Sequence, residues 1–162
     1  MISTNEFKAG MRRLVSGVSL VTTLSAEEKH GTIVTSVTSV SADPPTLLIC
    51  LNRGNSCHDA VMSSRVFCVN LLARRSEEIS RRFASPQNRE QRFQIGNWTT
   101  LVTGAPVLQD AMASFDCRVS HSIEAHSHTI FLGHIEDIRL AETLPPLLYG
   151  SGMYGDFTPA PM

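Results

Sequence analysis

Residues 35–41 read Thr-Ser-Val-Thr-Ser-Val-Ser, so five of these seven neighbouring side chains carry a hydroxyl group. A strand with one solvent-facing side alternates polar and apolar residues, whereas this segment places hydroxyls on both faces. Short hydroxyl side chains and nearby backbone N–H groups can bond the carbonyls and ring nitrogens of a flat heterocycle, and they leave room for its ring. The segment is therefore a candidate binding strand. The alternative is a threonine-rich edge strand that faces solvent.

A second candidate site follows directly after an apolar, strand-like segment, where residues 52–56 read Asn-Arg-Gly-Asn-Ser. Arg53 and Ser56 would lie at the start of a helix, where backbone N–H groups and the helix dipole favour an anion. Arg81 and Arg82 on the next predicted helix would add cationic contacts, because the guanidinium fork donates two hydrogen bonds to a phosphate. The alternative is a turn arginine and two solvated helix arginines.

The third candidate is a pair of histidines, His126 and His128, in the segment His-Ser-His-Thr. At this spacing the two side chains would lie on one side of a strand and could bind a metal ion. We do not predict a metal site. His128 at a strand start could instead line a pocket and donate to a substrate carbonyl or amide. The alternative is a solvated histidine at the end of a hairpin.

Hydrophobic periodicity predicts the elements that must position these residues. Ser3 and Glu6 have the spacing of a capping box, and we expect a helix that runs past Val15 and ends at Gly17. Two further short helices are expected, one capped by Ser56 and Asp59 and one that follows Ser76. The predicted strands cover residues 18–24, 32–41, 46–51, 66–73, 112–123 and 129–140.

We expect the first three strands to form an antiparallel meander and the last two to form a long hairpin. Residues 86–104 are polar and rich in turn residues, and we expect them to form a surface excursion. Six or seven strands with two or three short helices predict a mainly β domain that closes into a barrel, because closure removes exposed strand edges. The whole chain, residues 1–162, is predicted to be one domain.

Composition narrows the classes of function. The net charge of −1 and the 6% of aromatic residues argue against a nucleic-acid module, including an oligonucleotide-binding barrel. No apolar run is long enough to span a membrane, and the N-terminal residues do not resemble a signal peptide. The four cysteines form no CxxC pair and are expected to be free thiols. We therefore expect a cytoplasmic protein that binds neither nucleic acid nor membranes.

The order of these segments resembles the flavin reductase family, the reductase components of two-component flavin-dependent monooxygenases. The resemblance extends over roughly residues 5–157. Its fragments are Ser16-Gly17-Val18, the run TSVTSVSADPPTLLICLNR that begins at Thr35, Val69-Asn70-Leu71-Leu72, Arg82-Phe83-Ala84, Gly104-Ala105-Pro106, Phe115-Asp116-Cys117, His128-Thr129 and the tail from Tyr149 to Tyr154.

The resemblance implies an FMN-binding split β-barrel, usually a homodimer, that reduces FMN or FAD with NADH or NADPH and supplies a separate monooxygenase. Hydride would pass from the nicotinamide to the flavin, so the protein supplies orientation. His128 and Tyr154 are implied to lie on the side of the nicotinamide nucleotide. The residues implied to bind the flavin are Thr35, Ser36, Val37, Thr38, Ser39, Ser41, Leu51, Asn52, Arg53, Ser56, Arg82 and Phe83.

Two departures from the family pattern affect these expectations. His126-Ser127 replaces a Gly-Asp pair before the histidine, which removes a glycine suited to a tight turn. Met153 precedes the tail tyrosine where many relatives have an arginine. The alternatives that stay open are a non-catalytic flavin- or haem-binding split barrel and a reductase that serves a corrin or pyrimidine-pathway partner.

Overall fold

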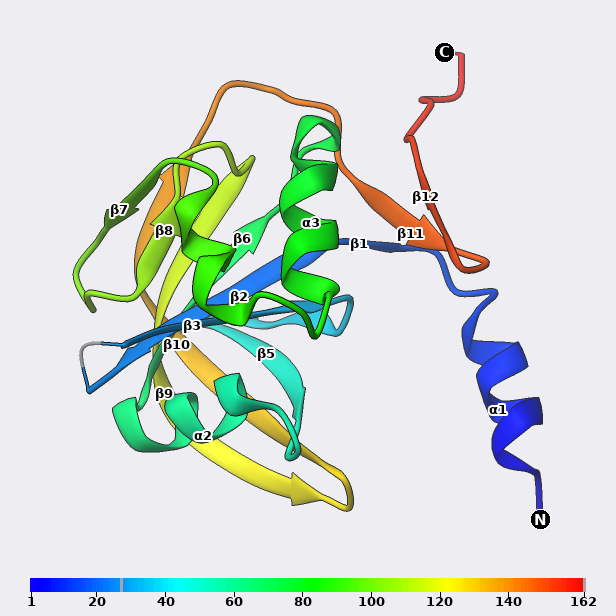
Figure 1. Ribbon diagram of the computed structural model, residues 1–162, viewed down its shortest axis with the longest axis horizontal. Coiled ribbons are helices and arrows are strands. Elements are labelled where there is room, and N and C mark those ends of the chain that lie inside the picture. The colour runs from blue at the N-terminus through cyan, green and yellow to red at the C-terminus, as the bar shows by residue number, and fades with distance from the viewer. Residues whose placement is uncertain (27, 162) are drawn as a thin grey trace.

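A computed structural model describes residues 1–26 and 28–161, and its largest feature in those ranges is a seven-stranded antiparallel sheet (Figure 1). The order of strands across the sheet is β3-β2-β6-β9-β10-β5-β4. Contacts between β3 and β5 bring its two ends together, so the sheet curls into a barrel. These strands are β2 (Ser19–Ser25), β3 (Glu28–Val34), β4 (Val37–Ala42), β5 (Pro45–Asn52), β6 (Val66–Leu71), β9 (Ala113–Ala125) and β10 (His128–Leu140).

The interior of the barrel is built from alternate residues of these strands. Leu47, Ile49 and Leu51 of β5 are buried and pack with Phe67 of β6 and Phe131 of β10 in one core cluster. A period of two puts such residues on one face of a strand. Burying each of these side chains stabilises the fold by about 1.5–3 kcal/mol. The expected mainly β architecture is confirmed.

The predicted hairpin is also confirmed. β9 and β10 are 13 residues each and pair from His128↔Ala125 to Leu140↔Ala113. The register shifts at Gly133, where β10 crosses the ring of Phe67 closely enough that a Cβ atom would collide with it.

The expected meander is wrong, and so is the single strand over residues 32–41. The chain forms two strands there, β3 ending at Val34 and β4 starting at Val37. β3 pairs with β2, and β4 pairs with β5 at the opposite end of the sheet order. The residues between them therefore cross the opening between the two sheet ends. A uniformly β-prone run does not reveal where a strand changes its partner.

Two helices pack against the barrel, α2 (Ser56–Ser64) and α3 (Glu77–Ala84). The predicted caps of α2 are wrong, because Asn55 precedes the helix and its Oδ1 accepts from the Cys57 amide at 2.9 Å. The helix expected after Ser76 is confirmed, although the Ser76 hydroxyl makes no cap hydrogen bond. Its buried residues include Ile79 and Phe83, which lie one turn apart on the same face.

The prediction of a surface excursion over residues 86–104 is only partly right. This segment contains a 3₁₀ helix at Arg89–Gln94 and the strand β7 (Trp98–Thr100), which pairs with β8 (Pro106–Leu108). The rings of Phe93 and Trp98 pack on Phe83, with centroid distances of 5.1 and 5.9 Å. The aromatic side chains thus hold a polar segment against the second core cluster.

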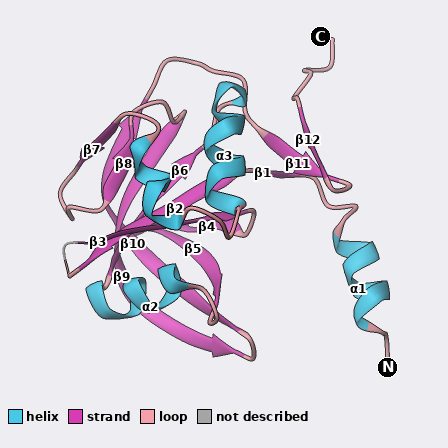
Figure 2. Ribbon diagram, viewed as in Figure 1, coloured by secondary structure: helices cyan, strands magenta, loops and turns pink. Residues whose placement is uncertain are grey.

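The remaining elements project from the barrel. A small sheet joins β1 (Ser16–Gly17), β11 (Leu148–Gly150) and β12 (Met153–Gly155), and α1 (Thr4–Met11) stands apart from the strands (Figure 2). The Ser3–Glu6 capping box is confirmed. The helix ends at Met11, however, well before the predicted end, and none of its residues is buried, so no packing favours further turns. None of the helices in the described ranges has the length and apolarity needed to cross a bilayer.

Candidate ligand-binding site

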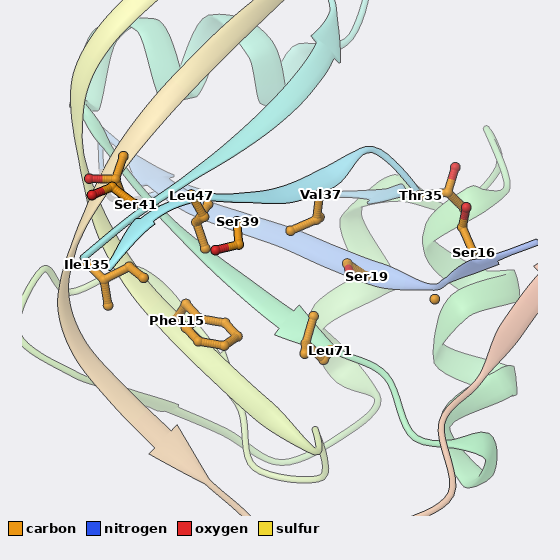
Figure 3. Close-up of a pocket in the computed structure, with 12 residues that line it drawn as sticks. Ser16, Ser19, Thr35, Val37, Ser39, Ser41, Leu47, Leu71, Phe115 and Ile135 are labelled. Carbon is orange, nitrogen blue, oxygen red and sulfur yellow. The ribbon is translucent and has the colours of Figure 1, made fainter. Parts of the chain in front are cut away.

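One face of β4 lines a cavity of about 540 Å³ (Figure 3). Ser39 and Ser41 point into it together with Val37, as alternate residues of a strand must. Phe115 and Ile135 form an apolar wall. A cavity of this size, with one hydroxyl wall and one apolar wall, suits a flat heterocycle with polar edges.

The other face of β4 is arranged differently. The Ser36 hydroxyl just before the strand donates to the Cys50 carbonyl oxygen at 3.1 Å, while Thr38 and Val40 are exposed. β4 is also the last strand in the sheet order, so one of its backbone edges has no partner strand among the described residues. The hydroxyl-rich segment is therefore an edge strand, as the alternative expects, and one of its faces also lines a cavity. The free edge offers backbone donors and acceptors to a ligand.

The turn between β5 and α2 is shaped by two asparagines. Asn52 Oδ1 accepts from the Gly54 amide at 2.8 Å, and Asn55 caps α2. The Asn55 side-chain amide also donates to Thr32 Oγ1 at 2.8 Å, which ties the turn to β3. These bonds leave Arg53 and Ser56 exposed. The role of Asn55 was missed in the sequence, although asparagine before a helix is a good cap signal.

The structure brings the turn and His128 close together. His128 pairs with Asn52 across β10 and β5, and the Arg53 amide donates to the Ser127 carbonyl oxygen at 2.9 Å. Arg53 also forms an ion pair with Glu124, with 3.6 Å between Nη1 and Oε2. The hairpin closes although its glycine is missing, because His126 adopts a φ of 54°.

A second cavity of about 630 Å³ adjoins Ser56 at the start of α2. Lys29, Arg89 and Arg92 line it, together with Glu28 and Glu90. Burial lowers the pKa of Arg92, and the neighbouring Arg89 lowers it further. An anion placed here would offset the repulsion between the two guanidinium groups. No local sequence signal predicts this cavity, because its wall forms only when residues 89–93 fold back onto β3.

Arg82, Phe83 and Tyr154 lie away from the β4 cavity. Phe83 is 2% exposed and its ring packs against Gly31, so a ligand cannot reach the Phe83 ring in this structure. Arg82 is half-buried on α3. Tyr154 donates to or accepts from the Ser80 hydroxyl at 2.8 Å. These three residues therefore border the α3 side of the molecule, and the structure does not bring them to His128.

A cationic side chain also lies on the ring of Tyr154, a contact that the sequence did not indicate. The Arg81 guanidinium stacks on the Tyr154 ring at 4.7 Å, and Arg81 is paired with Glu77. Arg81 thus brings a positive charge next to the tail tyrosine, where the sequence has Met153 in place of an arginine. In the described ranges, no group of three or more histidine, cysteine or acidic side chains is arranged to hold a metal ion.

The fold and the site together define a split β-barrel with a heterocycle-sized cavity lined by β4 and a helix start after β5 that suits an anion. A family model described as a flavin reductase like domain matches residues 11–158, and the chain belongs to this family. The FMN reductase (NADH) RutF of Agrobacterium fabrum is 39% identical over 149 residues, which cover 92% of this chain and 86% of that protein.

Two solved structures have the same fold. The NADH:FAD oxidoreductase SgcE6 of Streptomyces globisporus, in complex with NAD and FAD fragments, is 26% identical with a TM-score of 0.89, covering 98% of this chain and 97% of that one. Nitrilotriacetate monooxygenase component B of Mycobacterium thermoresistibile is 25% identical with a TM-score of 0.89, covering 98% of this chain and 91% of that one. The predicted family and the predicted split-barrel fold are confirmed.

Proposed function

We propose that this chain is an NADH-dependent flavin reductase that accepts FMN or FAD. The observation that carries the proposal is that β4, which lines the cavity, pairs with β5, and that the end of β5 carries the Asn52–Arg53 turn beside His128. The names of the relatives support it, since one is an FMN reductase that uses NADH and another is an NADH:FAD oxidoreductase.

The residues of the β4 cavity fit a flavin ring. Bound there, the flavin would accept a hydride from the nicotinamide, and this chemistry belongs to the two nucleotides. Backbone N–H groups of residues 36–39 would donate toward the polar edge of the ring and favour negative charge on it. Phe115 and Ile135 would exclude water from one side of the cavity. His128, half-exposed at the start of β10, would orient the nicotinamide, since a hydride step needs no protein base.

The phosphate of the flavin would lie at the start of α2. Arg53 and Ser56 are both exposed there, and the backbone amides of the first helical turn favour an anion. The cationic cavity next to Ser56 offers Lys29, Arg89 and Arg92 to further negative charge. We infer that the phosphate of FMN needs only Arg53 and Ser56, whereas the diphosphate of FAD would reach the cationic cavity.

We further propose that the reduced flavin passes to a separate oxygenase and that the protein is a homodimer in the cytoplasm. A solved relative is component B of a monooxygenase, which supports the first part. The exposed apolar residues of α1 support the homodimer. The four free cysteines suit a reducing compartment and so support the cytoplasm.

The deciding experiment is NADH and NADPH oxidation by purified protein with FMN, FAD or riboflavin added. We expect oxidation that depends on added flavin and that is faster with NADH than with NADPH. Tight flavin binding without oxidation in any combination would refute the reductase and leave the non-catalytic binding module.

A further inference from the structure

His58 is a buried histidine of α2 that the proposed chemistry does not use. It is 7% exposed, and both of its ring nitrogens have partners. Nδ1 lies 2.8 Å from Asp59 Oδ1, and Nε2 lies 2.9 Å from Thr129 Oγ1 on β10. Its ring also packs against Phe131 at 5.6 Å. His58 therefore does not reach a ligand at the start of α2.

The chemistry of the partners fixes the direction of both hydrogen bonds in the neutral ring. An ionised carboxylate only accepts, so Nδ1–H of His58 must donate to Asp59. Nε2 is then the acceptor, and the hydroxyl of Thr129 donates to it. Thr129 is 3% exposed, so neither group has water as a substitute partner. A buried pair of this kind is costly to break, because each unpaired group keeps its full desolvation penalty.

This hydrogen bond links two parts of the candidate site. His58 lies in the first turn of α2, whose start is the proposed phosphate site, and Thr129 is the neighbour of His128. Successive residues of a strand point to opposite faces, so holding Thr129 on the α2 side fixes the direction of His128 on the other. The turn between β5 and α2 also contacts the hairpin through the Arg53 amide, which donates to the Ser127 carbonyl oxygen at 2.9 Å, through the Arg53–Glu124 ion pair, and through the pairing of Asn52 with His128.

We propose that His58 and Thr129 are positioning residues whose buried hydrogen bond fixes the start of β10, and with it the orientation of His128 toward the nicotinamide nucleotide. The inference rests on the proposed reductase function only in its kinetic consequence. Its structural consequence, a hairpin start that loosens when the bond is removed, holds whatever the activity.

The test compares Thr129→Val, which removes the donor at nearly constant volume, with Thr129→Ser, which keeps it. The valine variant should raise the KM for NADH about fivefold, the effect expected for one lost hydrogen bond. Its KM for FMN should change less than about twofold, and the serine variant should match the wild type on this scale. His58→Leu removes the same bond from the other side and should reproduce the valine result. His121→Leu, an exposed histidine of the same hairpin, is the control and should change neither constant.

A variant background separates positioning from general destabilisation. In a His128→Ala background, Thr129→Val should raise the KM for NADH no further. A rise that persists there, or equal rises for NADH and FMN, overturns the proposal.

Amide hydrogen exchange at Arg53 gives a readout that needs no turnover. It should be faster in Thr129→Val than in wild type and unchanged in Thr129→Ser. If the wild type shows no flavin-dependent NADH oxidation, the reductase function fails, and the exchange result alone decides: faster exchange in the valine variant supports the positioning role, and unchanged exchange overturns it.

Discussion

Arg53 is the exposed cation at the point where the β5–α2 turn meets the hairpin, and Glu124 is its partner at 3.6 Å. An exposed ion pair of this kind contributes little to stability, so the arginine is free to bind a phosphate instead. We expect Arg53→Gln to raise the KM for FMN about tenfold, the loss of one charge-assisted hydrogen bond. Riboflavin, which lacks the phosphate, is the control substrate, and an equal rise for riboflavin would remove Arg53 from the phosphate site.

His126 occupies the first position of a two-residue hairpin turn, where its φ of 54° favours glycine. A left-handed conformation is unfavourable for a residue with a Cβ atom, and glycine relieves this at some cost in backbone entropy. We expect His126→Gly to increase the free energy of unfolding by about 0.5–1 kcal/mol. Urea denaturation measures the change, and a lower stability would contradict the explanation.

Among the strands, β10 is the element most constrained by a single glycine. A Cβ atom on Gly133 would collide with the buried ring of Phe67 and approach Cys117. We expect Gly133→Ala to lower the free energy of unfolding by about 1–3 kcal/mol, the usual cost of overpacking a core. Gly155→Ala is the matched control, because nothing lies within 4 Å of the added atom there. Equal effects of the two substitutions in chemical denaturation would refute the close-approach argument.

The same elements show how far the sequence could predict the fold. The β9–β10 hairpin and the helix after Ser76 were predictable, because their hydrophobic periods are regular and local. The break between β3 and β4 was not, because residues on both sides have the same β propensity and only pairing with distant strands separates them. The early end of α1 was missed for a related reason. Leu14 and Val15 continue the helical spacing of apolar residues, but none of the residues of α1 is buried, so no packing extends the helix to them.

On the scale of the whole molecule, the candidate site joins four separate stretches of chain, namely residues 35–41, 52–56, 89–93 and 126–128. Residues 35–41 and 52–56 were identified from their own chemistry, because hydroxyl clusters and capped helix starts are local signals. The cationic wall at residues 89–93 was not, since it depends on the packing of Phe93 against Phe83. The sequence therefore indicated the local parts of the candidate site, and only the fold revealed the cationic wall.

Helix α1 belongs to the same scale, because none of its residues is buried against the described parts of the chain. Phe7 and Met11 lie one turn apart on it, are at least half exposed, and line a cleft that also includes Thr35 before β4. An isolated helix of 8 residues is marginal in water, so we expect a second copy of the chain to cover this face. Phe7→Lys should convert the dimer to a monomer in sedimentation velocity. Asn5→Lys adds the same charge on the opposite face of α1 and should leave the dimer intact.

The shared position of Thr35 gives this assembly a consequence for binding. Thr35 lines both the α1 cleft and the β4 cavity, so the partner copy would border the flavin site. We therefore expect the Phe7→Lys monomer to bind FMN at least about tenfold more weakly than the wild type, because one wall of the cavity is then open to solvent. Flavin fluorescence titration measures this affinity. A monomeric wild type, or a Phe7→Lys monomer with unchanged FMN affinity, would show that the flavin site is complete within one chain.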